Sequence, residues 1–200
     1  MNRSKQQEAI QLFRAKGLLR PCEMERAGLS RGLLYQMVVD GTVLRSGRGI
    51  YTLADMALSE NHSYAEAVKR VPNGIICLLS ALRFHKITMQ NPTEVWVAVP
   101  HGSWRSQARG LKLRVVQYSG SALTDGVKSH QIEGVTVPVT SVARTIVDCF
   151  KFRNKIGTDV AWEALREAWG KKLFKMDELW SHGRTLRMTR VMMPYLEAMT

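Results

Sequence analysis

The stretch GLSRGLLYQMVVDGTVLRSGRGIYTL, residues 28–53, constrains the fold most strongly. Ser30 is of a residue type that caps helices, and apolar residues recur at helical spacing from there to Gly41. These apolar residues are Leu33, Leu34, Met37 and Val38. Two strand-like runs follow, residues 42–45 and 50–53, joined by the sequence Ser-Gly-Arg-Gly, which favours a turn. The stretch therefore predicts a short helix followed directly by a β-hairpin.

Two further helices are predicted before this stretch. Residues 4–16 form an amphipathic pattern, residues 18–20 are a short extended piece, and a proline opens a short helix over residues 21–26. Three helices and a hairpin in this order are typical of a winged helix-turn-helix, whose last helix enters a DNA groove beside the hairpin, or wing. The alternative is an ordinary hairpin in which Arg45 and Arg48 are simply solvated.

The charge balance points to a polyanionic partner. The 200 residues include 29 Lys and Arg against 17 Asp and Glu, a net charge of +12 with a pI near 10.0. Because 45% of the residues are hydrophobic and 23% are charged, as in ordinary globular proteins, disorder does not account for the charge. We therefore expect a folded protein that binds nucleic acid.

Cysteine usage and hydropathy indicate the compartment. Cys22, Cys77 and Cys149 are far apart and odd in number, which favours neither a disulfide framework nor a zinc site. The N-terminus is polar, and the apolar run at residues 74–82 is about half the length of a membrane span. We expect a complete cytoplasmic protein with no membrane partner.

The weaker periodicity of residues 55–61 predicts a linker between two domains, residues 1–55 and 62–200. The predicted second domain is α+β, with a small sheet and C-terminal helices. Its predicted strands are residues 94–99, 111–118 and 135–139, the last at a sheet edge because it contains Pro138. Its predicted helices are residues 64–70, 75–84, 141–150, 158–168 with Thr158 as the cap, 176–180 and 189–199.

The sequence lacks the spacings that common enzymes require. It contains no G-x-S-x-G, no phosphate-binding loop, no H-E-x-x-H and no paired cysteines. The alternative function is a metal-dependent nuclease or another nucleic-acid-modifying enzyme, with Glu94 and Lys112 as candidates. Because LKLRVVQY has no acidic residue two positions before its lysine, we expect no enzyme, no catalytic residue, no metal ligand and no cofactor.

Three features of the predicted second domain have structural and functional interpretations. Asp148 lies in an apolar helix, where we expect it to pair with Arg144 one turn earlier. Trp162, Trp169 and Trp180 fall on predicted helices as core residues, but Trp162 and Trp169 are seven apart and share a face that is also suited to a partner. A pure interaction module that holds an acidic toxin is a further alternative.

The order of several segments resembles a known family. A winged helix is followed by PNGIICLLSALRFHKIT, VWVAVP, VPVTSVARTIVDCFKFRNKIGTDVAWEALREAW and VMMPYLEAM. This order resembles AbiEi-type antitoxins of type IV toxin-antitoxin and abortive-infection phage-defence systems, over nearly the whole chain. The resemblance implies a bacterial transcriptional autorepressor whose winged helix binds promoter repeats in double-stranded DNA. It also implies a second domain that counteracts a nucleotidyltransferase-like toxin, with or without a stable complex.

The resemblance places the recognition helix at residues 30–39 and the wing at residues 44–51. The DNA-binding residues that it implies are Ser30, Arg31, Tyr35, Gln36, Arg45, Arg48, Arg3 and Lys5. Arg31 suits guanine and Gln36 suits adenine, while the other arginines suit phosphates or the minor groove. Gly32 and Val39 are poor readers of bases, which favours recognition of DNA shape and backbone over base edges.

Overall fold

The computed structural model describes residues 3–88, 92–103 and 111–199. It combines helices with small sheets, which confirms the predicted α+β class. The described residues form two compact units, the first made of residues 3–72, 111–112 and 130–137 and the second of the remaining described residues. The division into domains of residues 1–55 and 62–200 stays a prediction.

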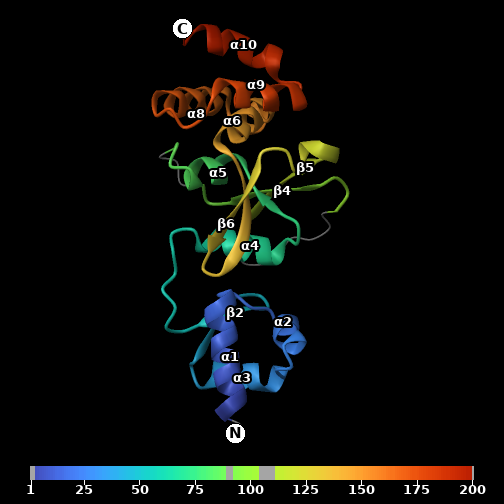
Figure 1. Cartoon of the computed structure of the whole chain (residues 1–200), viewed down its shortest axis with the longest axis vertical. Coiled ribbons are helices and arrows are strands. Elements are labelled where there is room, and N and C mark those ends of the chain that lie inside the picture. The colour runs from blue at the N-terminus through green and yellow to red at the C-terminus, as the bar shows by residue number, and fades with distance from the viewer. Residues whose placement is uncertain (1–2, 89–91, 104–110, 200) are drawn as a thin grey trace. The chain divides into compact units, whose positions relative to one another are not determined.

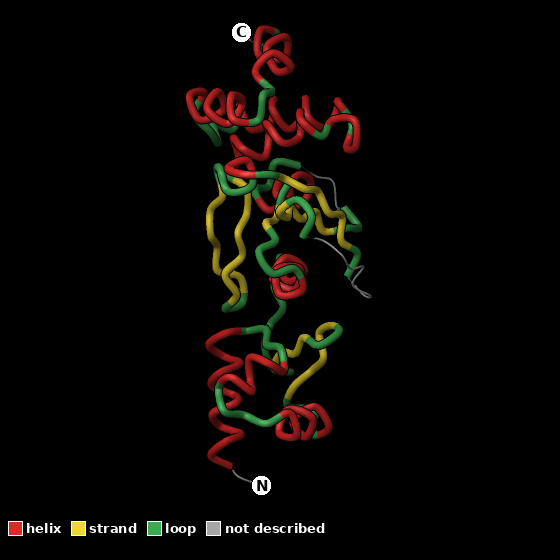
Figure 2. Tube along the Cα trace, turned by 90° about the vertical axis from the view of Figure 1, so that its right-hand side faces the viewer, coloured by secondary structure: helices red, strands yellow, loops and turns green. Residues whose placement is uncertain are grey.

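The first unit begins with the predicted three helices and hairpin. Figure 2 shows the helices in red and the hairpin strands in yellow near the N-terminus. The elements are α1 (Arg3–Lys16), α2 (Pro21–Arg26), α3 (Arg31–Val39), β1 (Val43–Gly47) and β2 (Ile50–Leu53). Strand β1 runs two residues further than predicted, so Arg48 and Gly49 alone form the hairpin tip.

A small apolar core holds these elements together. Its buried residues are Ala9, Phe13, Leu19, Met24, Leu29, Leu34, Met37, Val43 and Leu53. Of the predicted stripe on α3, Leu34 and Met37 are buried, whereas Leu33 and Val38 are half-buried. Leu19, in the predicted extended piece, exchanges two backbone hydrogen bonds of 3.0 and 2.9 Å with Tyr51 of β2. The connection between α1 and α2 therefore adds a third strand segment to the hairpin.

Two glycines allow the end of α1 to meet a distant turn of the same unit. A Cβ on Gly17, whose φ is +63°, would lie 1.5 Å from the carbonyl oxygen of Glu133. A Cβ on Gly134, at φ +75°, would lie 2.8 Å from the carbonyl carbon of Lys16. Real Cβ atoms do not approach other atoms this closely, so both positions require glycine. Residues 133 and 134 thus pack against the C-terminal end of α1.

The larger sheet has five strands in the order β5-β4-β3-β7-β6. The strands are β3 (Ile75–Ile76), β4 (Val95–Pro100), β5 (Leu113–Tyr118), β6 (Val127–Ile132) and β7 (Val135–Thr140). Strand β4 pairs in parallel with β5 and antiparallel with β3, and residues 95–99 are buried, as predicted for a strand covered on both faces.

One strand prediction and one helix prediction need correction, and one strand was missed. The strand 135–139 is not at an edge, because β7 lies between β3 and β6. Pro138 is tolerated there since β7 pairs with β3 only at Ile76 and Val139. Ile75 and Ile76 form strand β3 rather than the start of the predicted helix, because β-branched residues favour strands. Strand β6 was not predicted, because its sequence VKSHQI shows little apolar alternation.

Helices complete the second unit, and α4 (His62–Arg70) belongs to the first. Figure 1 shows α6, α8, α9 and α10 gathered toward the C-terminus. The helices are α5 (Leu78–Phe84), α6 (Val142–Lys151), α7 (Arg153–Ile156), α8 (Thr158–Gly170), α9 (Met176–Thr185) and α10 (Thr189–Glu197), with a 3-10 turn, η1 (Gly120–Ala122). The predicted Thr158 cap is wrong: Gly157, at φ +101°, occupies the cap position, because the chain turns sharply there out of the unpredicted α7.

A buried polar cluster anchors α6 in the second unit. Arg144 donates from Nε to Oδ1 of Asp148 at 2.9 Å, which confirms the predicted pair, and it also donates to the backbone oxygens of Ala122 and Asp125. The Tyr118 hydroxyl donates to the same Asp148 oxygen. Burial, and then the negative charge of Asp148, raise the pKa of Tyr118 and keep it a neutral donor. The cluster therefore ties α6 to β5 and to the segment that precedes β6.

We expect Asp148→Ala to lower the free energy of unfolding by about 3–5 kcal/mol, because it leaves the Arg144 guanidinium buried without its carboxylate. Urea unfolding followed by tryptophan fluorescence measures this, since Trp96 and Trp162 lie in the same unit. The exposed Glu163→Ala on α8 is the control and should change the free energy by less than about 0.5 kcal/mol. A loss below about 1 kcal/mol in Asp148→Ala would contradict the structural role of the pair.

Candidate nucleic-acid interface

The outer face of α3 is open to solvent along its whole length. Ser30 begins the helix, and its Oγ accepts a hydrogen bond from the Leu33 N–H at 3.2 Å. The exposed residues are Arg31, Gly32, Tyr35, Gln36 and Val39, which share one helical face. The structure therefore exposes the three side chains of α3 that were predicted to face the DNA groove.

A groove separates α3 from the hairpin. It has a volume of about 330 Å³ and is lined by Pro21, Arg31, Leu34, Tyr35, Val38, Arg45 and Tyr51. Arg45 and Tyr51 are directly opposite each other in the β1–β2 ladder, so their side chains leave the hairpin on the same face. The groove thus combines arginines from a helix and from the wing with two tyrosines, which suits an anionic backbone with adjacent apolar groups.

Arg31 is already paired across the surface of the unit. Its Nε lies 2.7 Å from Oε1 of Glu25 in α2, and its Nη2 donates to Oε2 at 3.1 Å. The hydrogen bond to Glu25 raises the pKa of Arg31. Because both side chains are well exposed, this pair contributes little stability. The guanidinium is nevertheless held in the two-pronged geometry that it needs for a phosphate or a guanine.

The wing contains a β-bulge that redirects Ser46. Arg45 is paired with Tyr51 and Gly47 with Ile50, so Ser46 is an extra residue on β1. Its Oγ lies 2.8 Å from Nε2 of His62, at the start of α4. The bulge therefore turns one wing side chain inward as an anchor.

His62 continues this anchor into a chain of hydrogen bonds. Its Nδ1 lies 2.6 Å from Oε2 of Glu133, whose other oxygen accepts from the Ser59 N–H at 2.7 Å and from the Ser59 hydroxyl at 2.8 Å. Burial raises the pKa of Glu133, but the hydrogen bonds from His62 and Ser59 outweigh burial and leave it lowered. The wing, the linker and the turn at Glu133 are thereby joined within one unit.

A second contact supports the base of the wing. Glu66 and Arg70 form an ion pair on α4, and a Cβ on Gly47 would lie 2.1 Å from Oε1 of Glu66. Lys69, on the same helix, lies 2.7 Å from Oε1 of Glu23 in α2. Helix α4 is therefore tied to both the wing and α2, which sequence reasoning missed because these partners are distant in sequence.

The remaining predicted DNA-binding residues lie outside the groove lining. Gln36 is exposed beside Tyr35 on α3, and Arg48 is exposed at the hairpin tip, next to Gly49 at φ +69°. Arg3 and Lys5 are exposed on the first turns of α1. The structure thus brings Arg31, Tyr35 and Arg45 to one groove and leaves the others on the surrounding surface.

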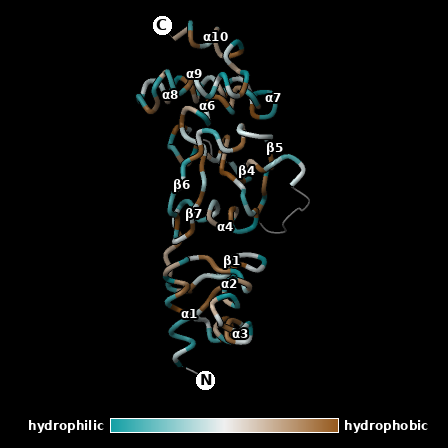
Figure 3. Tube along the Cα trace, turned by 45° about the vertical axis from the view of Figure 1, so that its right-hand side comes forward, coloured by the Kyte–Doolittle hydropathy of each residue, from teal (hydrophilic) through white to brown (hydrophobic). Residues whose placement is uncertain are grey.

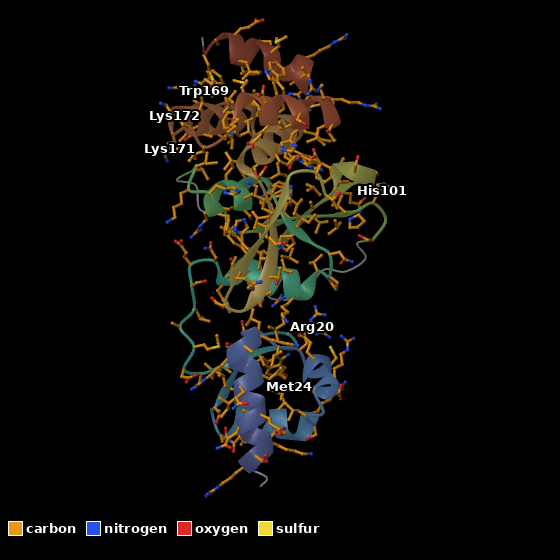
Figure 4. All side chains as sticks on the ribbon, in the orientation of Figure 1. Arg20, Met24, His101, Trp169, Lys171 and Lys172 are labelled. Carbon is orange, nitrogen blue, oxygen red and sulfur yellow. The ribbon has the colours of Figure 1, made fainter. Side chains whose placement is uncertain are left out.

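The candidates for other functions lie elsewhere. Glu94 is half-buried before β4, Lys112 is exposed before β5, and no group of three His, Cys, Asp or Glu gathers among the described residues. Trp162 is half-buried, with its ring 5.6 Å from that of Tyr195. Trp169 is the penultimate residue of α8, and Figure 4 shows it near Lys171 and Lys172. Trp169 is 42% exposed, so the prediction that it is a core residue is wrong, because it lies at the solvent-exposed end of α8.

No helix within residues 3–88, 92–103 and 111–199 has the length and apolarity that a membrane crossing requires.

The segment that forms the groove matches a known family. Residues 7–54 match the family described as "Transcriptional regulator, AbiEi antitoxin". This segment is similar to AbiEi antitoxin regulators. The match confirms the predicted resemblance over residues 7–54, which contain α2, α3 and both wing strands, including Arg31, Tyr35 and Arg45. No curated protein matches the chain.

The lowered pKa of Glu133 predicts an acid-sensitive first unit. Because its pKa in the folded protein is below the ordinary 4.5, its contribution is complete above pH 4.5 and is lost as the pH falls through the lowered value. We expect Glu133→Gln to be about 1–3 kcal/mol less stable than the parent chain at pH 7, and this difference to shrink toward pH 3. Urea unfolding followed by circular dichroism measures both.

The matched control for this experiment is Glu8→Gln, which alters an exposed carboxylate on α1 of the same unit. It should leave the stability nearly unchanged at both pH values. An equal deficit of Glu133→Gln at pH 7 and pH 3 would show that ionisation of Glu133 is not what stabilises the wing anchor.

Proposed function

We propose that this chain is a DNA-binding transcriptional repressor of its own promoter and the antitoxin of a type IV toxin-antitoxin system. The groove between α3 and the wing supports this proposal most strongly. It joins Arg31 and Arg45 beside an uncovered helix face, within the segment that is similar to AbiEi regulators. The net charge of +12 agrees with a polyanionic partner.

In the proposed mechanism α3 enters the major groove and the wing follows the adjacent backbone. Arg45 and Arg48 neutralise phosphates, and Arg31 exchanges the carboxylate of Glu25 for a phosphate or a guanine edge. Gln36 is placed beside Tyr35 to pair with adenine. Occupation of the promoter by the bound protein excludes the polymerase and represses transcription.

The second unit carries the antitoxin role in this proposal. Its segments, including VARTIVDCF on α6, resemble the corresponding part of AbiEi-type antitoxins. We propose that it opposes a nucleotidyltransferase-like toxin in the cytoplasm, with or without a stable complex, or that it joins adjacent copies on promoter repeats. No enzymatic step is part of this mechanism.

The proposal is tested by fluorescence anisotropy on the DNA directly upstream of the chain's own coding sequence and on a scrambled duplex, over a salt series. We expect at least a tenfold preference for the upstream DNA, about 1.4 kcal/mol. Arg45→Ala with Arg48→Ala should weaken binding to both duplexes. It should also reduce the slope of log affinity against log salt by up to about 1.8, because each phosphate contact contributes about 0.9.

Arg184→Ala with Arg190→Ala is the matched control, since it removes the same charge from exposed positions on α9 and α10. The control should retain most of the parent slope. Equal binding of upstream and scrambled DNA would contradict operator recognition, whereas equal slopes of the two double variants would exclude the wing from the interface.

Gly32→Ala separates stability from DNA binding. A Cβ at this position meets only Ser30 Oγ at 3.8 Å, so alanine fits the folded chain and should stabilise α3 by about 0.5–1 kcal/mol. If α3 lies against DNA, the added methyl group should nevertheless weaken binding to the upstream duplex. Thermal unfolding and anisotropy measure the two effects. Unchanged DNA binding in the stabilised variant would contradict close approach of this helix face.

A further inference from the structure

The exposed face of α3 differs in composition from an ordinary solvated helix face. A solvated face is normally charged or strongly polar. Here Arg31 is the one charged side chain among the exposed residues of α3, and it is paired with Glu25. Tyr35 is 73% exposed and Val39 is 71% exposed. The two largest exposed fractions among the large hydrophobic residues of the described chain therefore both lie on this helix face.

These two residues form one apolar ridge. Tyr35 and Val39 are four residues apart on the same helix, so their side chains are neighbours on its surface. The core does not require them, because Leu34 and Met37 already bury the opposite side of α3. Figure 3 shows α3 largely in the brown of hydrophobic residues. The ridge is therefore available to a partner that offers apolar groups.

The charges around the ridge indicate the nature of that partner. Arg31 precedes Tyr35 by one turn, and Arg45 faces the adjoining groove. Gly32, beside Arg31, has no side chain to hold a partner away from the helix. An anionic partner that carries small apolar groups near its backbone fits an apolar ridge with arginines beside it. In the major groove of DNA, the C5-methyl group of thymine is such a group.

We propose that Tyr35 and Val39 recognise thymine through its C5-methyl group in the major groove. This inference rests on the proposed function, because it requires α3 to lie in that groove. The amide of Gln36, exposed next to Tyr35, pairs with adenine. The helix therefore selects operator sites that combine thymine methyl groups with adenine. Val39, which cannot form a side-chain hydrogen bond, contributes apolar contact with a methyl group.

Removal of the methyl groups from DNA tests the inference directly. Duplexes of about 30 base pairs tile the DNA upstream of the coding sequence, and the tightest is remade with deoxyuridine in place of every thymidine. Base pairing is kept and only C5-methyl groups are lost. We expect the affinity of the full chain, measured by anisotropy at one salt concentration, to fall about fourfold for each methyl group that the ridge buries.

Variants of the ridge assign this effect to the named side chains. Val39→Ser and Tyr35→Ala should each bind the thymidine duplex more weakly and lose part of the discrimination against deoxyuridine. Leu58→Ser is the matched control, because Leu58 is an exposed apolar residue, 59% accessible, in the same unit but outside α3. It should keep the full discrimination of the parent chain.

The outcomes distinguish this inference from the proposed function. A chain that prefers upstream to scrambled DNA but binds both forms of the duplex equally overturns methyl recognition and leaves the repressor intact. A chain without any preference for upstream DNA overturns both. If Val39→Ser retains full discrimination but dissociates a dimer seen by sedimentation velocity, the ridge is a protein contact and the inference is wrong.

Discussion

The hydrogen bond between His62 and Glu133 is the interaction on which the candidate interface depends. Nδ1 of His62 meets the carboxylate at 2.6 Å, while its Nε2 meets the bulged Ser46 of the wing at 2.8 Å. The wing also packs into the apolar core through Val43 and Leu53 and pairs with Leu19, and the hydrogen bonds of His62 add its contact with α4. Tied to α4 by this imidazole and packed through Gly47 against the Glu66–Arg70 pair, the wing gains a fixed position beside α3. That position creates the groove.

The groove is part of a basic protein, but one of its two arginines is already paired with a carboxylate. The chain carries a large positive charge, yet the Arg31 guanidinium is occupied by Glu25. In the proposed mechanism the DNA replaces this carboxylate with a phosphate or a guanine edge, both of which can accept two hydrogen bonds from a guanidinium. In the same mechanism, non-specific attraction to DNA comes from the whole basic surface, whereas selectivity comes from the face of α3. The scarcity of charge on that face supports the proposal that α3 recognises DNA through shape and apolar contact.

The two units depend on polar clusters of different kinds. In the second unit Arg144, Asp148 and Tyr118 are buried, and their hydrogen bonds hold α6 against the sheet. In the first unit, Ser46 and His62 keep partial exposure, so their bonds position a surface element rather than a core. The desolvation of a buried ion pair offsets much of its attraction, but loss of one partner leaves an uncompensated buried charge. The Arg144–Asp148 pair therefore makes each partner necessary to the other.

The sequence by itself determined the local structure of residues 3–53. Hydrophobic periodicity, the Ser30 cap, Pro21 and the glycines fix helices and hairpin through interactions within a few residues, and the Arg144–Asp148 pair is one helical turn long. Only the tertiary structure decided that Arg31 and Arg45 share a groove and that β7 is interior despite Pro138. It also decided that His62 and Glu133, 71 positions apart, anchor the wing. These features arise between segments far apart in sequence. No local pattern records them, because strand neighbours, glycine contacts and shared hydrogen bonds exist only once the chain has folded.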